Sequence, residues 1–117
     1  MTKPNQSNPK EAASLTKLRL KAKLFKGFAD ATRLAIFEAL KGGEKTVSQI
    51  VEATGFNQPN VSNHLNTLRE SGLVRYRQKG RNVYYSIRDQ RVAQALDIVE
   101  KILVDISKET YESLIGS

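Results

Sequence analysis

The sequence predicts a small, mostly helical domain with one β-hairpin, in the order helix, helix, helix, helix, strand, strand, helix. Three observations predict it. Apolar residues recur at helical spacing in a helix that starts at Gln58 and ends near Gly72. A short amphipathic segment, 46–54, precedes this helix, and two runs rich in β-forming residues, 73–78 and 82–87, follow it around a polar turn. Two helices joined by a tight turn and followed by a hairpin make a winged helix-turn-helix.

Length and charge limit what the chain can be. Its 117 residues suffice for one hydrophobic core and not for two, so we expect a flexible tail over residues 1–10 and a single domain over residues 11–117. The net charge of +7 favours a polyanionic partner, because clustered Lys and Arg side chains release condensed counterions from nucleic acid. A soluble basic protein without such a partner is the alternative on charge alone.

The residue inventory excludes several kinds of site. The chain has no cysteine, which excludes disulfides, thiolate metal sites and thiol redox sensing. Its one histidine excludes a multi-histidine zinc site within one chain. No apolar run approaches the roughly 18 to 20 residues of a membrane span. The first residues lack the apolar centre of a signal peptide, so we expect a cytoplasmic protein.

The first helix is predicted from Glu11 to about Phe28, with apolar residues and cations interspersed. The segment from Lys17 to Lys26 contains five cations and no acid. This run is either a solvated face or a set of direct phosphate contacts, and the sequence does not separate the two.

The second helix is predicted over residues 31–41, with Asp30 as its N-cap and two glycines, 42 and 43, ending it. We interpret it as core scaffold. For Arg33 we expect an ion pair with a nearby carboxylate, and a phosphate contact is the alternative. The residues predicted to face the core are Leu34, Phe37 and Leu40.

The third helix covers segment 46–54 and ends at Gly55, a natural helix stop. Asn57 can then cap the fourth helix, and Pro59 falls in the first turn of that helix, where a missing N–H costs nothing. The residues of the third helix predicted to face inward are Val47, Ile50 and Val51.

The fourth helix has one narrow apolar seam. At 100° per residue, Val61, Leu65 and Leu68 fall within about 60° of each other. Apart from His64 there is no ionisable side chain between residues 57 and 68. We therefore interpret this as a recognition helix whose amides and hydroxyls hydrogen-bond base edges in a DNA major groove. The residues that point away from the seam are Pro59, Ser62, Asn63, Asn66, Thr67 and Glu70.

The hairpin is predicted to be a basic wing that turns at residues 79–82. Four cations fall within seven residues: Arg75, Arg77, Lys79 and Arg81. A winged helix that bound protein would not need this charge, so DNA is the favoured partner.

The last helix is predicted from Asp89 to roughly Tyr111, longer than a helix that caps a small domain requires. Its apolar surface exceeds the roughly 100° that one core contact uses, so we expect self-association, with packing on its own domain as the alternative. From Asp97 to Glu112 five acids outnumber two bases, and we expect this end to face away from DNA. The apolar residues are Val92, Ala95, Leu96, Ile98, Val99, Ile102, Leu103 and Ile106.

With these elements assigned, the chain resembles the ArsR/SmtB family of bacterial winged-helix repressors over about residues 24–106. LFKGFADATRLAIFEAL is similar to the opening helix pair of the family, and NQPNVSNHLNTLRESGLVRYRQKGRNVYYSI to its recognition helix and wing. The resemblance implies a homodimer, built from the first and last helices, that binds an imperfect inverted repeat and releases it when an inducer binds. It places the base-reading residues at Gln58, Pro59, Ser62 and Asn63.

The metal sites of that family are not matched. One family site has cysteines before the recognition helix, at positions held here by Thr46, Val47, Ser48 and Gln49, none of which is a soft ligand. Another site in the last helix falls on Asp89, Arg91, Ile102 and Asp105. Two carboxylates beside an arginine and an isoleucine do not make a tetrahedral zinc site. We expect no metal and no cofactor, and the inducer is unidentified. For His64 the resemblance implies packing or a phosphate contact.

We therefore predict a sequence-specific DNA-binding transcriptional repressor that acts as a homodimer on an inverted-repeat operator. An enzyme is disfavoured, because the chain has no nucleophile elbow, phosphate loop or metal-ligand cluster. A winged-helix protein that organises or partitions DNA is the alternative. The predicted DNA-binding residues are Gln58, Pro59, Asn60, Ser62, Asn63, His64, Asn66, Arg77, Lys79 and Arg81. The predicted dimer-interface residues are Leu15, Leu18, Leu96, Val99, Leu103 and Ile106.

Overall fold

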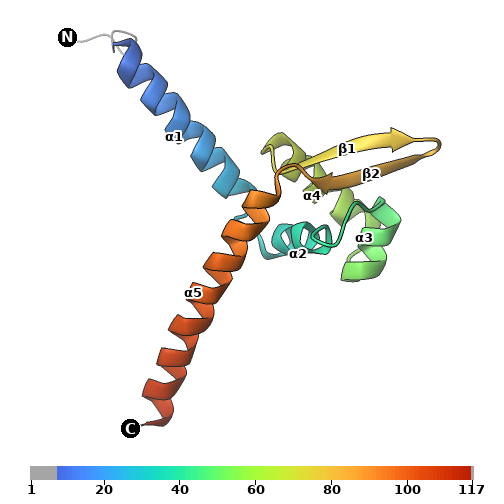
Figure 1. Ribbon diagram of the computed structural model, residues 1–117. Coiled ribbons are helices and arrows are strands. Elements are labelled where there is room, and N and C mark those ends of the chain that lie inside the picture. The colour runs from blue at the N-terminus through green and yellow to red at the C-terminus, as the bar shows by residue number, and fades with distance from the viewer. Residues whose placement is uncertain (1–7, 117) are drawn as a thin grey trace.

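The computed structural model describes residues 8–116 and confirms the predicted order of elements (Figure 1). A helical body is followed by a two-stranded antiparallel hairpin and a long final helix. The elements are α1 (Pro9–Gly27), α2 (Ala31–Ala39), α3 (Val47–Thr54), α4 (Gln58–Glu70), β1 (Val74–Lys79), β2 (Asn82–Ile87) and α5 (Gln90–Ile115).

The helix starts follow local capping chemistry, as predicted. The side chains of Asp30 and Asn57 accept hydrogen bonds from backbone N–H groups three residues on, at 3.0 and 2.9 Å, which satisfies donors that the first helical turn leaves unpaired. Thr46 and Gln49 form a reciprocal capping box at the start of α3. Gly55 ends α3 with a φ of 77°, a left-handed conformation that favours glycine.

Several element boundaries differ from the prediction. Helix α1 begins at Pro9, inside the predicted tail, because the Asn8 side chain accepts from the Glu11 N–H at 2.8 Å and proline suits the first turn. Residues 1–7 of that tail lie outside the described residues. Helix α2 ends at Ala39, two residues early. Helix α5 runs on to Ile115, because no glycine or proline interrupts it before Gly116.

The core lies between α2, α3, α4 and the base of the hairpin. The predicted seam of α4 is confirmed, since Val61, Leu65 and Leu68 are fully buried. Leu34, predicted to face the core, is instead half-buried, and Ile36 beside Phe37 takes the fully buried position. The other fully or almost fully buried apolar residues are Phe37, Leu40, Ile50, Leu73, Val74, Ile87 and Ala93.

The hairpin is anchored to the body at its base. Val74 pairs with Ile87, and the register continues to Lys79 opposite Asn82, so Lys79 belongs to the strand and the turn is Gly80–Arg81. Gly80 has a φ of 63°, which suits the first position of a two-residue hairpin turn. On the outer side of β2, Lys45 and Tyr85 exchange two backbone hydrogen bonds of 2.9 and 2.8 Å.

The end of α1 packs closely against the end of α4. A Cβ added at Gly27 would come within 2.8 Å of the Ser71 side chain and 2.7 Å of Leu73 Cδ1, so only glycine allows this approach. The Arg33 guanidinium donates to the carbonyls of Gly27 and Lys26 at 2.8 and 3.2 Å. Within residues 8–116 the guanidinium forms no ion pair of the kind predicted for Arg33, because the carbonyls at the end of α1 take its donors.

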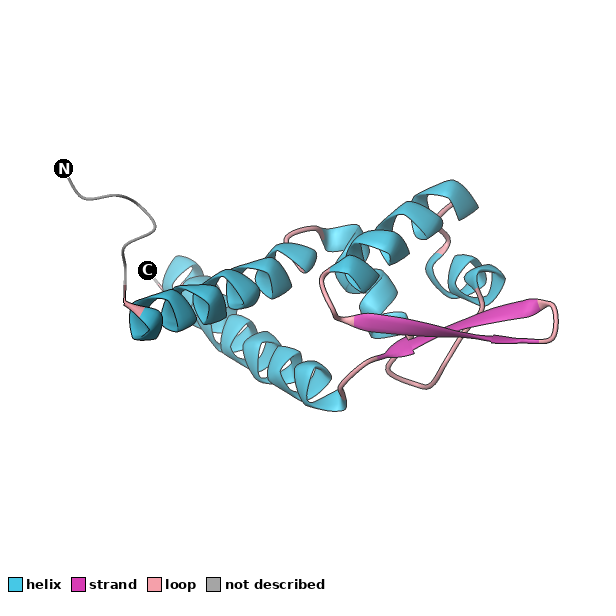
Figure 2. Cartoon of the chain, turned by 90° about the horizontal axis from the view of Figure 1, so that it is seen from above, coloured by secondary structure: helices cyan, strands magenta, loops and turns pink. Residues whose placement is uncertain are grey.

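Helices α1 and α5 project from the body on the side opposite to the wing (Figures 1 and 2). The radius of gyration is 18.8 Å, against about 13 Å for a compact domain of this length. Gly27 is the only buried residue within the bounds of α1, and Ala93 the only one within those of α5. These two helices therefore leave most of their apolar side chains uncovered within one chain.

Candidate nucleic-acid interface

Helix α4 presents a polar face opposite its buried seam. Gln58, Pro59, Asn63 and Asn66 are exposed, and Asn60 and Ser62 are half-buried. These six predicted residues come from the start and outer face of one helix. Their amide and hydroxyl groups supply both donors and acceptors, as the edge of a base pair requires.

His64 lies one turn after Asn60, between the polar face of α4 and its buried seam. Its side chain is only 19% exposed, with Nε2 at 4.0 Å from Asp30 Oδ1 and Nδ1 at 3.4 Å from an Arg33 nitrogen. The backbone N–H of Arg33 and the neighbouring His64 hold the pKa of the Asp30 carboxyl below its ordinary value. Of the two roles that the sequence left open for His64, this position favours packing.

The wing carries its cations in two different environments. Lys79 and Arg81 are exposed at the end of the hairpin. Arg77 instead forms a bidentate ion pair with Glu44, in the loop between α2 and α3, with Nε at 2.8 Å from Oε2. Its guanidinium also lies 5.4 Å from the centroid of the Tyr84 ring. The hydrogen bonds from Arg77 hold the pKa of Glu44 below its ordinary value.

The opposite face of the wing contacts α4. The guanidinium of Arg69, near the end of α4, lies 5.0 Å from the centroid of the Tyr76 ring. Tyr76 in turn packs against Tyr85 of β2, with ring centroids 5.9 Å apart. Sequence reasoning assigned no role to Glu44 or Arg69. Strand alternation could have put Arg77 and Tyr84 on one face, but it could not have supplied Glu44.

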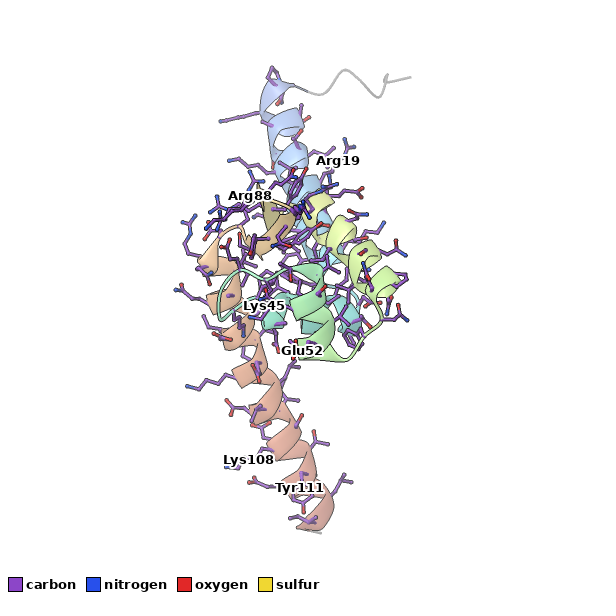
Figure 3. All side chains as sticks on the ribbon, turned by 90° about the vertical axis from the view of Figure 1, so that its right-hand side faces the viewer. Arg19, Lys45, Glu52, Arg88, Lys108 and Tyr111 are labelled. Carbon is purple, nitrogen blue, oxygen red and sulfur yellow. The ribbon has the colours of Figure 1, made fainter. Side chains whose placement is uncertain are left out.

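The cations of α1 are exposed, and some of them approach α4. Lys23, Lys26 and Arg33 line a surface cavity of about 370 Å³ together with Thr67, Glu70 and Ser71. Within residues 8–116 no ion pair joins Lys23 or Lys26 to a carboxylate. Figure 3 shows Arg19, which is nearer the start of α1, in the upper part of the view.

The predicted dimer-interface residues form uncovered apolar surface. Leu15 and Leu18 on α1, and Val99, Leu103 and Ile106 on α5, are all about half exposed, at 48 to 57%. Leu96 is half-buried and lines an apolar cavity of about 320 Å³ between α1, α2 and α5. The far end of α5, with Lys108 and Tyr111, extends well away from the body (Figure 3).

The residues at the family's metal-site positions do not gather as ligands. Asp89 accepts hydrogen bonds from the Arg91 side chain, the shortest at 2.7 Å, and these bonds lower the pKa of Asp89 to about 2. Ile102 is exposed. In the described part of the chain, no three His, Asp or Glu side chains lie close enough together to hold a metal ion. None of the described helices is long and apolar enough to cross a membrane.

Comparison with known proteins identifies the class. Residues 30–76 match the family model "Bacterial regulatory protein, arsR family". The chain is 37% identical over 84 residues to a "Probable mercury resistance operon repressor" of Streptomyces lividans. The aligned residues cover 72% of this chain and 67% of the relative. It is 40% identical over 83 residues to the "HTH-type transcriptional regulator CmtR" of Mycobacterium tuberculosis, covering 70% of each chain.

A solved structure extends the likeness to the fold. The solution structure of the homodimeric winged helix-turn-helix DNA-binding domain Mb0332 from Mycobacterium bovis superposes with a TM-score of 0.75 at 32% identity. The match covers 92% of this chain and 95% of that chain. The predicted winged helix-turn-helix and the predicted class, a regulator and not an enzyme, are thereby confirmed. The chain belongs to the ArsR family of bacterial regulatory proteins.

Proposed function

We propose that this protein is a transcriptional repressor that binds an inverted-repeat operator as a homodimer, with residues 11–117 acting as one DNA-binding and dimerisation domain. The polar outer face of α4, beside a wing with cations at its tip, is the observation that carries the proposal. Gln58, Pro59, Asn60, Ser62, Asn63 and Asn66 read base edges, and Lys79 and Arg81 hold the phosphate backbone. Since its partner is genomic DNA, we place it in the cytoplasm.

The dimer is proposed to form through α1 and α5. The apolar side chains on these helices, including Leu15, Leu18, Val99 and Leu103, are about half exposed within one chain. Exposed apolar surface of this kind is typical of a protein–protein interface. The relative of known structure is described as homodimeric. A two-fold dimer presents two copies of α4, which matches the symmetry of an inverted repeat.

We further propose that this repressor does not respond to metals. One relative is named for mercury resistance, but this chain contains no cysteine. The Asp89 carboxylate is already hydrogen-bonded by Arg91. Any inducer of this repressor is therefore of another chemical class.

The test separates base reading from phosphate anchoring. A side-chain amide matches the N7 acceptor and N6 donor of adenine, so Asn63→Ala or Gln58→Ala should cost about 1–3 kcal/mol on the cognate duplex. Binding to a scrambled duplex should stay nearly unchanged. Arg81→Ala should weaken binding to both duplexes and lower the slope of log affinity against log salt by about 0.9 for each phosphate that the variant no longer neutralises.

These variants are titrated on both duplexes at several salt concentrations. Suppose that Arg81→Ala no longer discriminates between the two duplexes, whereas Asn63→Ala binds both of them equally more weakly. The roles would then be reversed, with the wing reading bases and α4 anchoring the phosphate backbone. Footprinting on genomic DNA distinguishes a repressor from a DNA-organising protein. A single palindrome over a promoter supports repression, and tandem arrays of sites support organisation.

A further inference from the structure

One cation of the wing, Arg77, binds other side chains of the same chain. The Arg77 guanidinium donates to both carboxylate oxygens of Glu44 and lies over the ring of Tyr84. Tyr84 is directly opposite Arg77 in the strand register, so both side chains lie on one face of the hairpin. We call Glu44, Arg77 and Tyr84 the wing clamp.

The wing clamp reaches from the wing to the body. Arg77 is on β1, and the loop that carries Glu44 joins β2 on its other side, through the paired backbones of Lys45 and Tyr85. The guanidinium therefore crosses β2 and points away from the hairpin tip. Because the loop containing Glu44 leads directly into α3, the clamp connects the wing to the helix-turn-helix.

A second contact lies on the other face of the hairpin. Arg69 of α4 stacks on Tyr76, and Tyr76 packs on Tyr85. The two contacts act at neighbouring positions of β1, 76 and 77, near the middle of the strand. Within residues 8–116, Lys79 and Arg81 at the tip form no ion pair and no cation–π contact, so these two contacts restrain the base of the wing and not its tip.

We propose that Glu44 and Arg77 are positioning residues that hold the wing at a fixed angle to α4, and that Arg77 is not a phosphate contact. This inference rests on the proposed DNA-binding function. A phosphate would have to displace a bidentate carboxylate from Arg77, whereas Lys79 and Arg81 are exposed and form no ion pair within residues 8–116. With the angle fixed, base contacts by α4 and phosphate contacts by the wing tip form together. The clamp thus raises affinity on a cognate site, where both sets must fit.

The central variant is Glu44→Gln, which removes the carboxylate charge and keeps the shape of the side chain. Glu52→Gln is the matched control, because Glu52 is exposed on α3 and forms no ion pair in the described residues. Both variants raise the net charge equally, so the difference between them reports the local interactions of Glu44, of which the hydrogen bond from Arg77 is the largest. Figure 3 shows Glu52 on the side from which the wing projects.

Relative to Glu52→Gln, Glu44→Gln should weaken cognate binding by about two- to fivefold for each half-site, the range that an exposed ion pair can supply. Binding to a scrambled duplex and the salt slope should match the control. Arg77→Lys keeps the charge but loses the planar fork, so it should show the same cognate loss. If Glu44→Gln binds both duplexes more tightly than the control, with a steeper salt slope, then Arg77 is a phosphate contact and the inference fails. Equal cognate affinity of Glu44→Gln and Glu52→Gln also overturns the inference.

A second measurement needs no DNA. The chain has no cysteine, so Ala53→Cys on α3 and Asn82→Cys at the start of β2 can carry a pair of nitroxide labels. In mixtures with excess unlabelled protein, the distance distribution between the labels should broaden in Glu44→Gln and Arg77→Lys but not in Glu52→Gln. An unchanged distribution refutes the clamp. The two measurements separate the proposals. If wild-type protein binds the cognate and scrambled duplexes equally, the proposed function is refuted. If the distance distribution still broadens in Glu44→Gln, the clamp remains supported.

Discussion

Replacing Gly27 by alanine tests whether the junction between α1 and α4 is as tight as the structure shows. The added Cβ would lie 2.7 Å from Leu73 Cδ1 and 2.8 Å from both the Cβ and Oγ of Ser71. Leu73 is 1% exposed and belongs to the core, so it has little room to move. Forcing an extra methyl group into a packed site typically costs about 1–3 kcal/mol.

Part of this cost is offset, because alanine favours helix over glycine by about 1 kcal/mol in a helix interior and by less at a helix end. We therefore expect a net loss of about 1–2 kcal/mol. For 117 residues, the entropy of unfolding converts each kcal/mol to roughly 4 °C, so the melting temperature should fall by about 4–8 °C.

The matched control is Gly42→Ala. Gly42 has no heavy atom within 4 Å of the added Cβ and does not have a positive φ. This substitution should be neutral, or stabilising by about 0.4–1 kcal/mol through the unfolded state. Thermal unfolding followed by circular dichroism, at one protein concentration for both variants, measures the difference. If Gly27→Ala is as stable as Gly42→Ala, the junction between α1 and α4 accommodates the added methyl group and the packing argument fails.

Three further outcomes follow from the exposed surfaces. Leu103→Asp places a charge in the proposed α1–α5 interface, so sedimentation should show monomer, and an unchanged folded dimer would place the interface elsewhere. Equilibrium dialysis with zinc, cadmium or arsenite should find no stoichiometric high-affinity site, and a submicromolar site that also lowers DNA affinity would contradict this. The pair Lys23→Ala and Lys26→Ala, beside the end of α4, should reduce the salt slope of DNA binding, while Lys17→Ala and Lys21→Ala, on another side of α1, should not. A salt slope that is unchanged from wild type in both pairs would identify the α1 cations as a solvated face.

The features that could be predicted from sequence depend on residues that are close together along the chain. The seam of Val61, Leu65 and Leu68 follows from helical periodicity alone. The caps at Asp30 and Asn57 follow from a side chain and a backbone N–H three residues apart. Local steric and hydrogen-bonding rules suffice for such features, and they set the order of helices and strands and the polar face of α4. They set helix ends less well, because the last turn depends on neighbouring packing.

The remaining features depend on where distant segments meet. Arg33 meets carbonyls at the end of α1 instead of a carboxylate, and Arg77 meets Glu44, 33 residues earlier in the chain. The sequence predicts Arg77 as a DNA contact and Arg33 as one half of an ion pair, and composition alone could not show which groups of the fold take up their donors. Gly27 likewise reads as an ordinary glycine until Ser71 and Leu73 are packed against it. Sequence determined which surfaces are polar, basic or apolar, and tertiary structure decided which of those side chains remain free to bind, because hydrogen bonds and close packing require atoms to meet in space.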